Sequence, residues 1–569
     1  MHIDIVPNRN SKPAVLLRES YRDGKAVRKR TLANLSSLPL DQVEALRRIL
    51  KGERLVTIDD VFETVFSLQH GHVQAVLGVM EQLGFAKLLD SHRSKERDLV
   101  TAMIAWRVIR PSSKLATQRS WKDSTLPKLL HIENASEDDL YGAMDWLLLK
   151  QPKIEKALSK RHLKEDGLVL YDLSSSYFEG STCPLAKLGY NRDGKKGKLQ
   201  VNYGLVADER GCPVSVSVFE GNIGDPKTLI PAVEKVRTDF GVRNMAMVGD
   251  RGMISQKQID EIKELDGVGW ITALKTGAIR SLVEGGALQL GLFDERNLFE
   301  FEHGDYPGER LMACRNPELA KLRAHKRQSL LDATAKELER VRSMVEKGKL
   351  KNSNVIGVRA GKVVNKYKVA KHFKLDIEDG KFAYSINKEN VDEEANLDGV
   401  YVVRTSLKKD RLSTEDAVRN YKKLSQVERA FRSLKTIDLK VRPIHHRGGN
   451  RVRAHIFLCM LAYYVEWHMH EALRPLLFSD EELEAKKTRD PVAPAKRSAS
   501  ALAKARDKIT ADGFEAQSFR TLMDHLGTIV RNFCRRKGGE NNKGSEVIID
   551  STPNDIQQRA FDLLKSVSL

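Results

Sequence analysis

Three carboxylates stand at positions where an acid is unusual. Asp172 lies inside the apolar run GLVLYDLSSSYFEG, Asp250 follows the apolar run NMAMVG, and Glu428 lies among the apolar positions of a basic segment. Buried acids are costly without a partner, and acids that meet repel one another unless a cation lies between them. Oxygen ligands favour hard cations such as Mg²⁺ or Mn²⁺ over zinc. Two such ions can polarise a phosphodiester, generate the attacking oxygen and stabilise the leaving one.

The segment that carries Glu428 has the spacing of an amphipathic helix. The pattern predicts a helix over 414–435 that starts with Ser413 and Asp416 as a capping box. On a wheel of 100° per residue, Glu428 falls within about 60° of three other residues of this helix. These residues are Tyr421, Leu424 and Lys435. Glu428 is therefore predicted to lie on the apolar stripe, and a salt bridge with a nearby arginine is the structural alternative.

The elements that would position the acids follow a recognisable order. Strands and helices are predicted in the order β-β-β-α-β-α-β, near 168–178, 198–208, 212–221, 226–240, 244–253, 255–265 and 267–274. Three antiparallel strands followed by βαβ units are the layout of an RNase-H-like fold. In that layout the first and fourth strands are neighbours. Asp172 and Asp250 would then face a common point, and a later helix would bring Glu428 to it.

The fold class predicted for the whole chain is α/β. An RNase-H-like catalytic core is interrupted by an insertion domain, and the N- and C-terminal regions are mainly helical. The predicted domains are a hairpin and short helix at 1–55, a helical and DNA-binding domain at 56–165, the first part of the core at 166–280, the insertion at 281–400, the last strand and the Glu428 helix at 401–465, and a helical region at 466–569. The Asp23-Gly24 pair marks the turn of the hairpin.

Charge indicates a polyanionic partner. The chain of 569 residues has a net charge of +19, and the window 419–453 holds eleven Lys and Arg against Glu428 and Asp438. The five cysteines are scattered without a CxxC pair, which argues against a disulfide framework or a zinc ribbon and suits a reducing cytoplasm. No signal peptide and no apolar run of about 18 residues is present, so no membrane association is expected.

The same residues resemble a known family, the DDE-type bacterial insertion-sequence transposases whose RNase-H-like domain is split by an insertion. The Y-x2-R-x3-E-x6-K signature of that group aligns with Tyr421, Leu424, Glu428 and Lys435, and Leu424 stands where the group usually has Arg. YDLSSSYFEG and VGDRGM resemble the strands that carry the family's two Asp residues. The resemblance runs from roughly 165 to 465.

The resemblance implies a reaction and a set of partners. Asp172, Asp250 and Glu428 would hold two Mg²⁺ ions, with Mn²⁺ as a substitute. The chain would cleave DNA at the terminal inverted repeats of the element and join the ends to target DNA, as a homodimer that bridges two ends, in the bacterial cytoplasm at the nucleoid. A two-metal nuclease without strand transfer and an inactive protein that only binds the ends are the alternatives.

Several residues are expected to contact the DNA. By resemblance, Tyr421 and Lys435 would contact phosphates near the cleaved end, and Arg251 follows the second Asp. With Leu424 at the usual Arg position, that contact could pass to Lys423, Arg429 or Arg432. Some family members use an insertion-domain Trp to flip a base and form a hairpin, but 281–400 contains no Trp. The aromatic candidates for stacking there are Tyr367, Phe373, Phe382 and Tyr384.

Overall fold

The structure, a computed structural model, describes residues 1–8, 12–53, 62–482, 489–493, 496–536 and 546–568. The chain divides into two compact units. The smaller contains residues 1–69 and 529–552, and the larger contains 70–528 and 553–569. The predicted boundary between residues 55 and 56 falls at 54–61, which lie outside the described residues.

The smaller unit contains two three-stranded antiparallel sheets. The first consists of β1 (His2–Val6), β2 (Ala14–Asp23) and β3 (Ala26–Asn34), with helix α1 (Leu40–Leu50) after it. Strands β2 and β3 form a hairpin at the Asp23-Gly24 turn, where Gly24 has a φ of +60°. The second sheet has the order β16-β15-β4, from Glu546–Asp550, Val530–Arg536 and Phe62–Gln69.

This second sheet corrects two helical predictions. Residues Phe62–Gln69 lie in the range 56–165 that was expected to be helical, and Val530–Arg536 lie in the helical C-terminal region, yet they pair as strands. The physical reason is the alternation and aromatic content of FETVFSLQ, which suit a strand. Phe66 of β4 stacks on Phe533 of β15 with ring centroids 4.6 Å apart. The two strands are more than 400 residues apart, so no local pattern reveals their pairing.

The larger unit is built on an eight-stranded mixed sheet. Its order is β10-β11-β14-β9-β8-β5-β6-β7. The predicted core elements appear in the predicted order, as β5 (Gly167–Tyr177), β6 (Gln200–Ala207), β7 (Pro213–Glu220), α9 (Pro226–Thr238), β8 (Met245–Val248), α10 (Gln256–Lys263) and β9 (Val268–Ala273). Strands β5, β6 and β7 are antiparallel, whereas β8 is parallel to both β5 and β9. The first and fourth strands of the predicted layout are therefore neighbours, as predicted.

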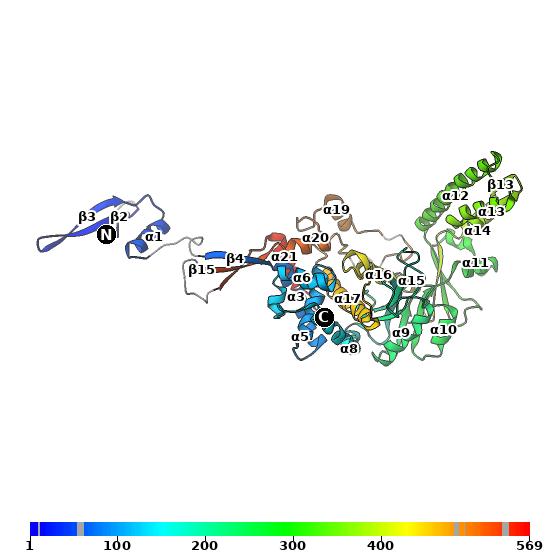
Figure 1. The fold of residues 1–569 in the computed structure, drawn as a ribbon, viewed down its shortest axis with the longest axis horizontal. Coiled ribbons are helices and arrows are strands. Elements are labelled where there is room, and N and C mark those ends of the chain that lie inside the picture. Colours follow the sequence, from blue (N-terminus) through cyan, green and yellow to red (C-terminus); the bar gives the residue numbers. More distant parts are fainter. Residues whose placement is uncertain (9–11, 54–61, 483–488, 494–495, 537–545, 569) are drawn as a thin grey trace. The chain divides into compact units, whose positions relative to one another are not determined.

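Helices pack against this sheet and against one another (Figure 1). Helix α9 contacts β5 and β6, and α16 (Leu424–Arg432) contacts β5. Helix α15 (Thr414–Lys422) contacts β9 and β14, and α17 (Gly449–Ala472) contacts β7. The close approach of α16 depends on Gly211, whose φ is +83°, because a Cβ there would lie 2.6 Å from Cβ of Gln426. This approach brings α16 and its acid over the strand that carries Asp172.

The remaining helices of this unit flank the same core. Before the sheet come α3 (Gly71–Gln82), α4 (Phe85–Leu89), α5 (Lys95–Ile109), α6 (Lys114–Ser120), α7 (Leu126–Leu130) and α8 (Glu137–His162). After it come α19 (Ala499–Asp507), α20 (Phe519–Leu526) and α21 (Asp555–Leu564). The helical prediction thus holds for the described residues 71–162. None of the described helices combines the length and apolar character needed to cross a membrane.

The predicted insertion range 281–400 divides into two structurally different parts. Helix α11 (Thr276–Glu284) leads to β10 (Leu298–Phe301) and β11 (Arg310–Arg315), which extend the central sheet through β14 (Val400–Thr405). Between β11 and β14 the chain forms α12 (Pro317–Glu346), α13 (Ser353–Lys366), β12 (Phe373–Glu378), β13 (Lys381–Ile386) and α14 (Lys388–Asn396). In Figure 1 these elements lie together as one group. Residues 317–396 therefore form a separate group, whereas β10 and β11 belong to the sheet.

The group at 317–396 has its own small core. Leu331, Leu338, Ile356, Phe373 and Phe382 are buried together there. Two of the aromatic residues expected to be available for stacking, Phe373 and Phe382, are thus only 7 % and 6 % exposed. Their physical role is to hold α12 and α13 against the β12–β13 hairpin.

Candidate active site

Asp172 is placed by the alternation of side chains along β5. Tyr171 points to the α9 side, where its hydroxyl donates to the carbonyl of Thr228 over 3.2 Å. The next residue must point to the opposite face, toward α16. Ser174 lies on the same face of β5 as Asp172 and pairs with Tyr203 of β6. The Tyr203 ring lies 5.7 Å from that of Phe431 on α16, which confirms that this face is turned toward α16. Asp172 is half-buried, and its Oδ1 accepts a hydrogen bond of 2.8 Å from the Leu173 amide.

Asp250 is placed by the parallel pairing of β5 with β8. Leu170 is level with Val248, so continuing the register by two residues brings Asp250 level with Asp172. The chain turns directly afterwards, and the amides of Gly252 and Met253 donate to Asp250 Oδ1 at 2.9 and 2.6 Å. Asp250 is exposed, and its Oδ2 makes no hydrogen bond with the described residues. One oxygen is therefore fixed, and the other is free to bind a ligand.

Glu428 lies on α16, but its surroundings differ from those predicted. It is exposed, so the prediction of a buried position on the apolar stripe is wrong. The predicted continuous helix over 414–435 is two α-helices that meet at Lys423, followed by a π-helical turn at Ser433–Ile437. A wheel of 100° per residue does not apply across these changes. The predicted cap at its start is present, because Ser413 Oγ accepts from the Asp416 amide.

The structural alternative for Glu428 was a salt bridge. Within the described part of the chain, Glu428 forms no ion pair. Leu424, Val427 and Phe431 occupy the buried side of α16 instead. Leu424 is 8 % exposed, so the position where the resembling family has Arg is a core position in this chain.

The electrostatics show that the three acids belong to one neighbourhood. Burial is the main reason that the pKa of Asp172 is raised from 3.8 to about 7. The charges of Asp250 and Glu428 act in the same direction, and the Leu173 amide and Arg192 act against them. Burial also raises the pKa of Tyr421 to about 12, with Asp250 and Glu428 acting in the same direction and Arg251 against them. The three carboxylates do not all lie within 4.8 Å of one another.

The donor chemistry of this neighbourhood fits hard divalent cations. The three side chains offer only carboxylate oxygens, as Mg²⁺ and Mn²⁺ prefer. Asp172 carries a pKa far above that of an ordinary Asp because the uncharged form relieves both burial and repulsion. A cation between the acids would reduce the same repulsion and the cost of burial while all three remain ionised. Asp172, Asp250 and Glu428 are thus the residues that could hold such ions.

The predicted DNA contacts fall into different places. Tyr421 and the exposed Arg251 lie beside the acids, since the charge of Arg251 acts on the Tyr421 hydroxyl. Lys423 pairs instead with Glu209 at 2.9 Å. Arg429 and Arg432 border a cavity of about 550 Å³ between α16, α17 and α20, whose lining includes none of the three acids. Only part of the predicted set therefore surrounds the acids.

Lys435 is buried in the structure, and its partner is a residue that the sequence did not single out. Lys435 Nζ lies 3.2 Å from Asp193 Oδ1, and Arg442 pairs with the same oxygen. Asp193 Oδ2 accepts from the Tyr177 amide at 3.0 Å, which ties the loop to the end of β5. Burial lowers the pKa of Lys435, and Asp193 opposes that change. Asp193 thus compensates two cations at once.

The neighbouring Arg192 was also missed. Its charge lowers the pKa of Asp172, and its guanidinium pairs with Asp225 at the start of α9. Both residues belong to the polar run NRDGKKGK, which has no periodicity. The only sequence signal was the dense charge of that run, which is equally typical of an exposed loop.

Replacing Asp193 by Asn is expected to destabilise the protein. The change leaves the buried Lys435 and the half-buried Arg442 without their shared anion, and removing one partner of a buried ion pair costs about 3–5 kcal/mol. Urea unfolding monitored by circular dichroism measures the change. Asp562→Asn is the matched control, because Asp562 pairs with Lys565 at the surface and exposed pairs contribute about 0–1 kcal/mol. Equal losses in the two variants would contradict the role given to Asp193.

Comparison with known proteins identifies the family of this chain. The Transposase DDE domain family matches residues 165–465, which is more than half of the chain, and the N-terminal domain of IS1634 family transposases matches residues 3–57. No curated protein sequence matches. Among solved structures, the cryo-EM structure of the piggyBac transposase synaptic complex with hairpin DNA is 9 % identical, with 80 % of this chain and 78 % of that chain covered and a TM-score of 0.33. A structural similarity at this score carries no argument, but the family match does: this chain belongs to the DDE transposases of insertion sequences.

Proposed function

We propose that this DNA transposase uses Asp172, Asp250 and Glu428 as its catalytic acids on an RNase-H-like core, with residues 317–396 as the insertion between the core strands and α16. The observation that carries the proposal is the raised pKa of Asp172, about 7, to which both other acids contribute. Acids from β5, from the end of β8 and from α16 influence one another although up to 256 residues separate them in the chain. The strand order β7-β6-β5-β8-β9 supports the assignment of the core.

The acids would bind two Mg²⁺ ions, or Mn²⁺ in their place. When bound, such ions polarise the scissile phosphate and stabilise both the attacking and the leaving oxygen. Asp250 is prepared for this role because two backbone amides fix its Oδ1 and leave Oδ2 free. Asp172 must lose its proton to bind a cation, so cations and protons compete for this side chain.

Other side chains would hold the DNA against the acids. The Tyr421 hydroxyl is protonated at neutral pH, as in an ordinary tyrosine, and burial raises its pKa further, to about 12. It can therefore donate a hydrogen bond to a phosphate oxygen. Arg251 is exposed beside it and would neutralise a neighbouring phosphate. Lys435 would contact DNA only after leaving Asp193. More distant parts of the DNA would be contacted by Lys423, Arg429 and Arg432. DNA binding through such contacts weakens steeply as the salt concentration rises.

The partners would be the terminal inverted repeats of the element and a target DNA at the nucleoid. A homodimer would bridge two ends. Mixing the purified chain with DNA that carries one end, a supercoiled target plasmid and Mg²⁺ tests the function. The expected products are a cleaved end with a 3′-hydroxyl and a covalent joint to the plasmid. Cleavage without joining would favour a nuclease, and binding of the end without cleavage would favour an inactive end-binding protein; either result overturns the proposal.

A further inference from the structure

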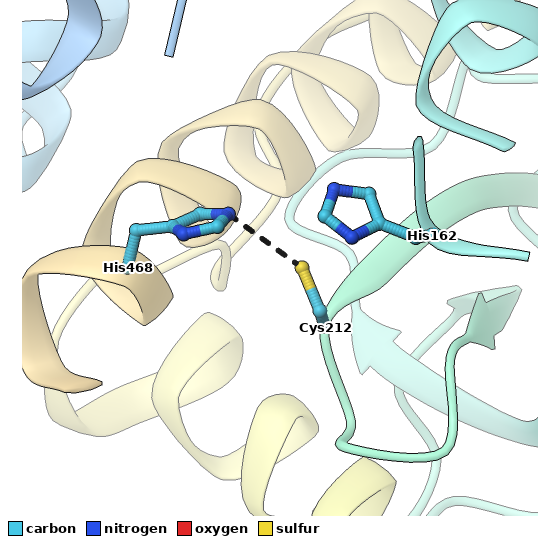
Figure 2. Close-up of side chains that lie close together, drawn as sticks. All are labelled: His162, Cys212 and His468. Carbon is cyan, nitrogen blue, oxygen red and sulfur yellow. Dashed lines mark hydrogen bonds between the residues drawn. The ribbon is translucent and has the colours of Figure 1, made fainter. Parts of the chain in front are cut away.

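Three side chains far from the catalytic acids converge in the interior of the larger unit. His162 is the last residue of α8, Cys212 directly precedes β7, and His468 lies on α17. One donor atom from each lies within 4.8 Å of the others, and all three residues are buried. Figure 2 shows the two rings and the thiol turned toward one another, with His468 Nε2 3.9 Å from Cys212 Sγ. We call these residues the His-Cys-His cluster.

The hydrogen bonds of His162 identify which ring nitrogen carries the hydrogen. Arg210 donates to Nδ1 over 3.2 Å, so Nδ1 is the unprotonated nitrogen. Nε2 then carries the hydrogen and donates to the Tyr464 hydroxyl at 2.9 Å. Histidine ligands of metals commonly donate their second N–H in this way, which fixes the ring and raises its basicity. Arg210 can release Nδ1 and still keep Asp208, 2.8 Å away.

The cluster offers two imidazoles and one thiol, with no carboxylate among its three donors. Neutral imidazole is the form that coordinates a metal. The side chain of Cys212 must lose a proton to bind, and the three ligands would then carry a single negative charge.

A cavity borders two of the three side chains of the cluster. A cavity of about 750 Å³ is lined by His162 and His468 together with Asp208, Arg210 and Trp467. Asp208 Oδ2 lies 3.8 Å from His162 Nδ1 and adds a compensating charge. A water molecule would complete a four-coordinate site as the fourth ligand.

We propose that the His-Cys-His cluster binds one borderline divalent cation of the zinc class. Two imidazoles and one thiolate suit Zn²⁺ or Co²⁺, whereas Mg²⁺ prefers oxygen ligands. The cation would tie α8, the beginning of β7 and α17 together, and so connect the helices before and after the core to its edge strand. This site is chemically distinct from the three carboxylates, and its occupancy is measurable without DNA.

Cobalt is the probe for the test. The full chain is purified under reducing conditions, treated with a chelator, and titrated with Co²⁺ in the presence of excess Mg²⁺. The expected result is a sulfur-to-cobalt charge-transfer band in the near ultraviolet that saturates at about one equivalent and disappears when Zn²⁺ is added. In Cys212→Ser the band is lost, and in His468→Gln the affinity for Co²⁺ falls by about tenfold or more.

The chain contains a matched control. Cys459 is also buried, and its Sγ lies 3.9 Å from Nδ1 of His455, but it does not belong to the cluster. Cys459→Ser should keep the full charge-transfer band. Circular dichroism of each variant without metal verifies its fold, and zinc content measured on the untreated protein gives a second readout. Absence of the band in the wild-type protein, its persistence in Cys212→Ser, or its loss in Cys459→Ser alone would overturn the proposal.

Discussion

Substituting Asn for Asp172 is expected to slow DNA cleavage by on the order of a thousandfold or more, because one charged ligand is removed from a site that must stabilise charge in the transition state. Asp250→Asn and Glu428→Gln are expected to have effects of similar size. Each change keeps the shape of the side chain and removes only its charge. Binding of the end DNA should change much less, since the basic residues remain. The rate of single-turnover cleavage with saturating Mg²⁺ measures the effect.

Two control variants separate a loss of chemistry from a loss of structure. Ser174→Ala changes a buried residue two positions further along the same face of β5. Glu415→Gln removes an exposed acid from the first turn of α15. Both should cleave within about threefold of wild type, since surface and conservative changes have small effects. If Glu428→Gln cleaves as fast as Glu415→Gln, Glu428 is not a catalytic acid.

The convergence of Asp172 and Asp250 could be predicted because it depends on consecutive local patterns. Each strand of the core has its own apolar run, and the order of strands and helices limits which strands become neighbours. The register of β5 and β8 then places the two acids level with each other. Family resemblance added Glu428, which local patterns alone left open between an ion pair and a functional role.

The surroundings of Glu428 could not be predicted from periodicity. The value of 100° per residue assumes one regular α-helix. In the structure the first α-helix ends at Lys423, and a π-helical turn that carries Lys435 follows the second. Neither change has a periodic signal in the sequence. For the same reason the exposed position of Glu428 and the burial of Lys435 against Asp193 are visible only in the folded chain.

The other differences between the predictions and the structure arise from contacts between residues that are far apart in the sequence. Strands β10 and β11 lie within the predicted insertion, but β14, the strand that joins β11 to the central sheet, follows more than 80 residues after β11. The His-Cys-His cluster is a stronger case, because 256 residues separate Cys212 from His468. Spacing motifs such as CxxC detect only ligands that are close in sequence, so the scattered cysteines argued against a zinc ribbon without bearing on a site assembled from distant elements.

The pKa of Asp172 makes a second large effect measurable without DNA. In the metal-free protein this pKa is about 7, against 3.8 for an ordinary Asp. The folded state therefore binds this proton more tightly than the unfolded state, and folding stability falls as the pH rises from about 4 through about 7. Each pKa unit corresponds to about 1.4 kcal/mol, so the loss could reach about 4 kcal/mol, with solvent at the half-buried carboxylate making the effect smaller.

Asp172→Asn cannot ionise and should escape this loss. In a chelator, the variant is expected to be more stable than wild type at pH 8 by about 2 kcal/mol or more, and nearly equal to it at pH 4. Mg²⁺ should stabilise the wild type at pH 8 but have little effect on the variant, because ligands stabilise the state that binds them. Urea unfolding at both pH values measures these differences, with Ser174→Ala as the control expected to follow the wild-type pH dependence. Parallel pH profiles for wild type and Asp172→Asn would show that Asp172 is already ionised in the free protein, and the competition between proton and cation at this acid would then have to be abandoned.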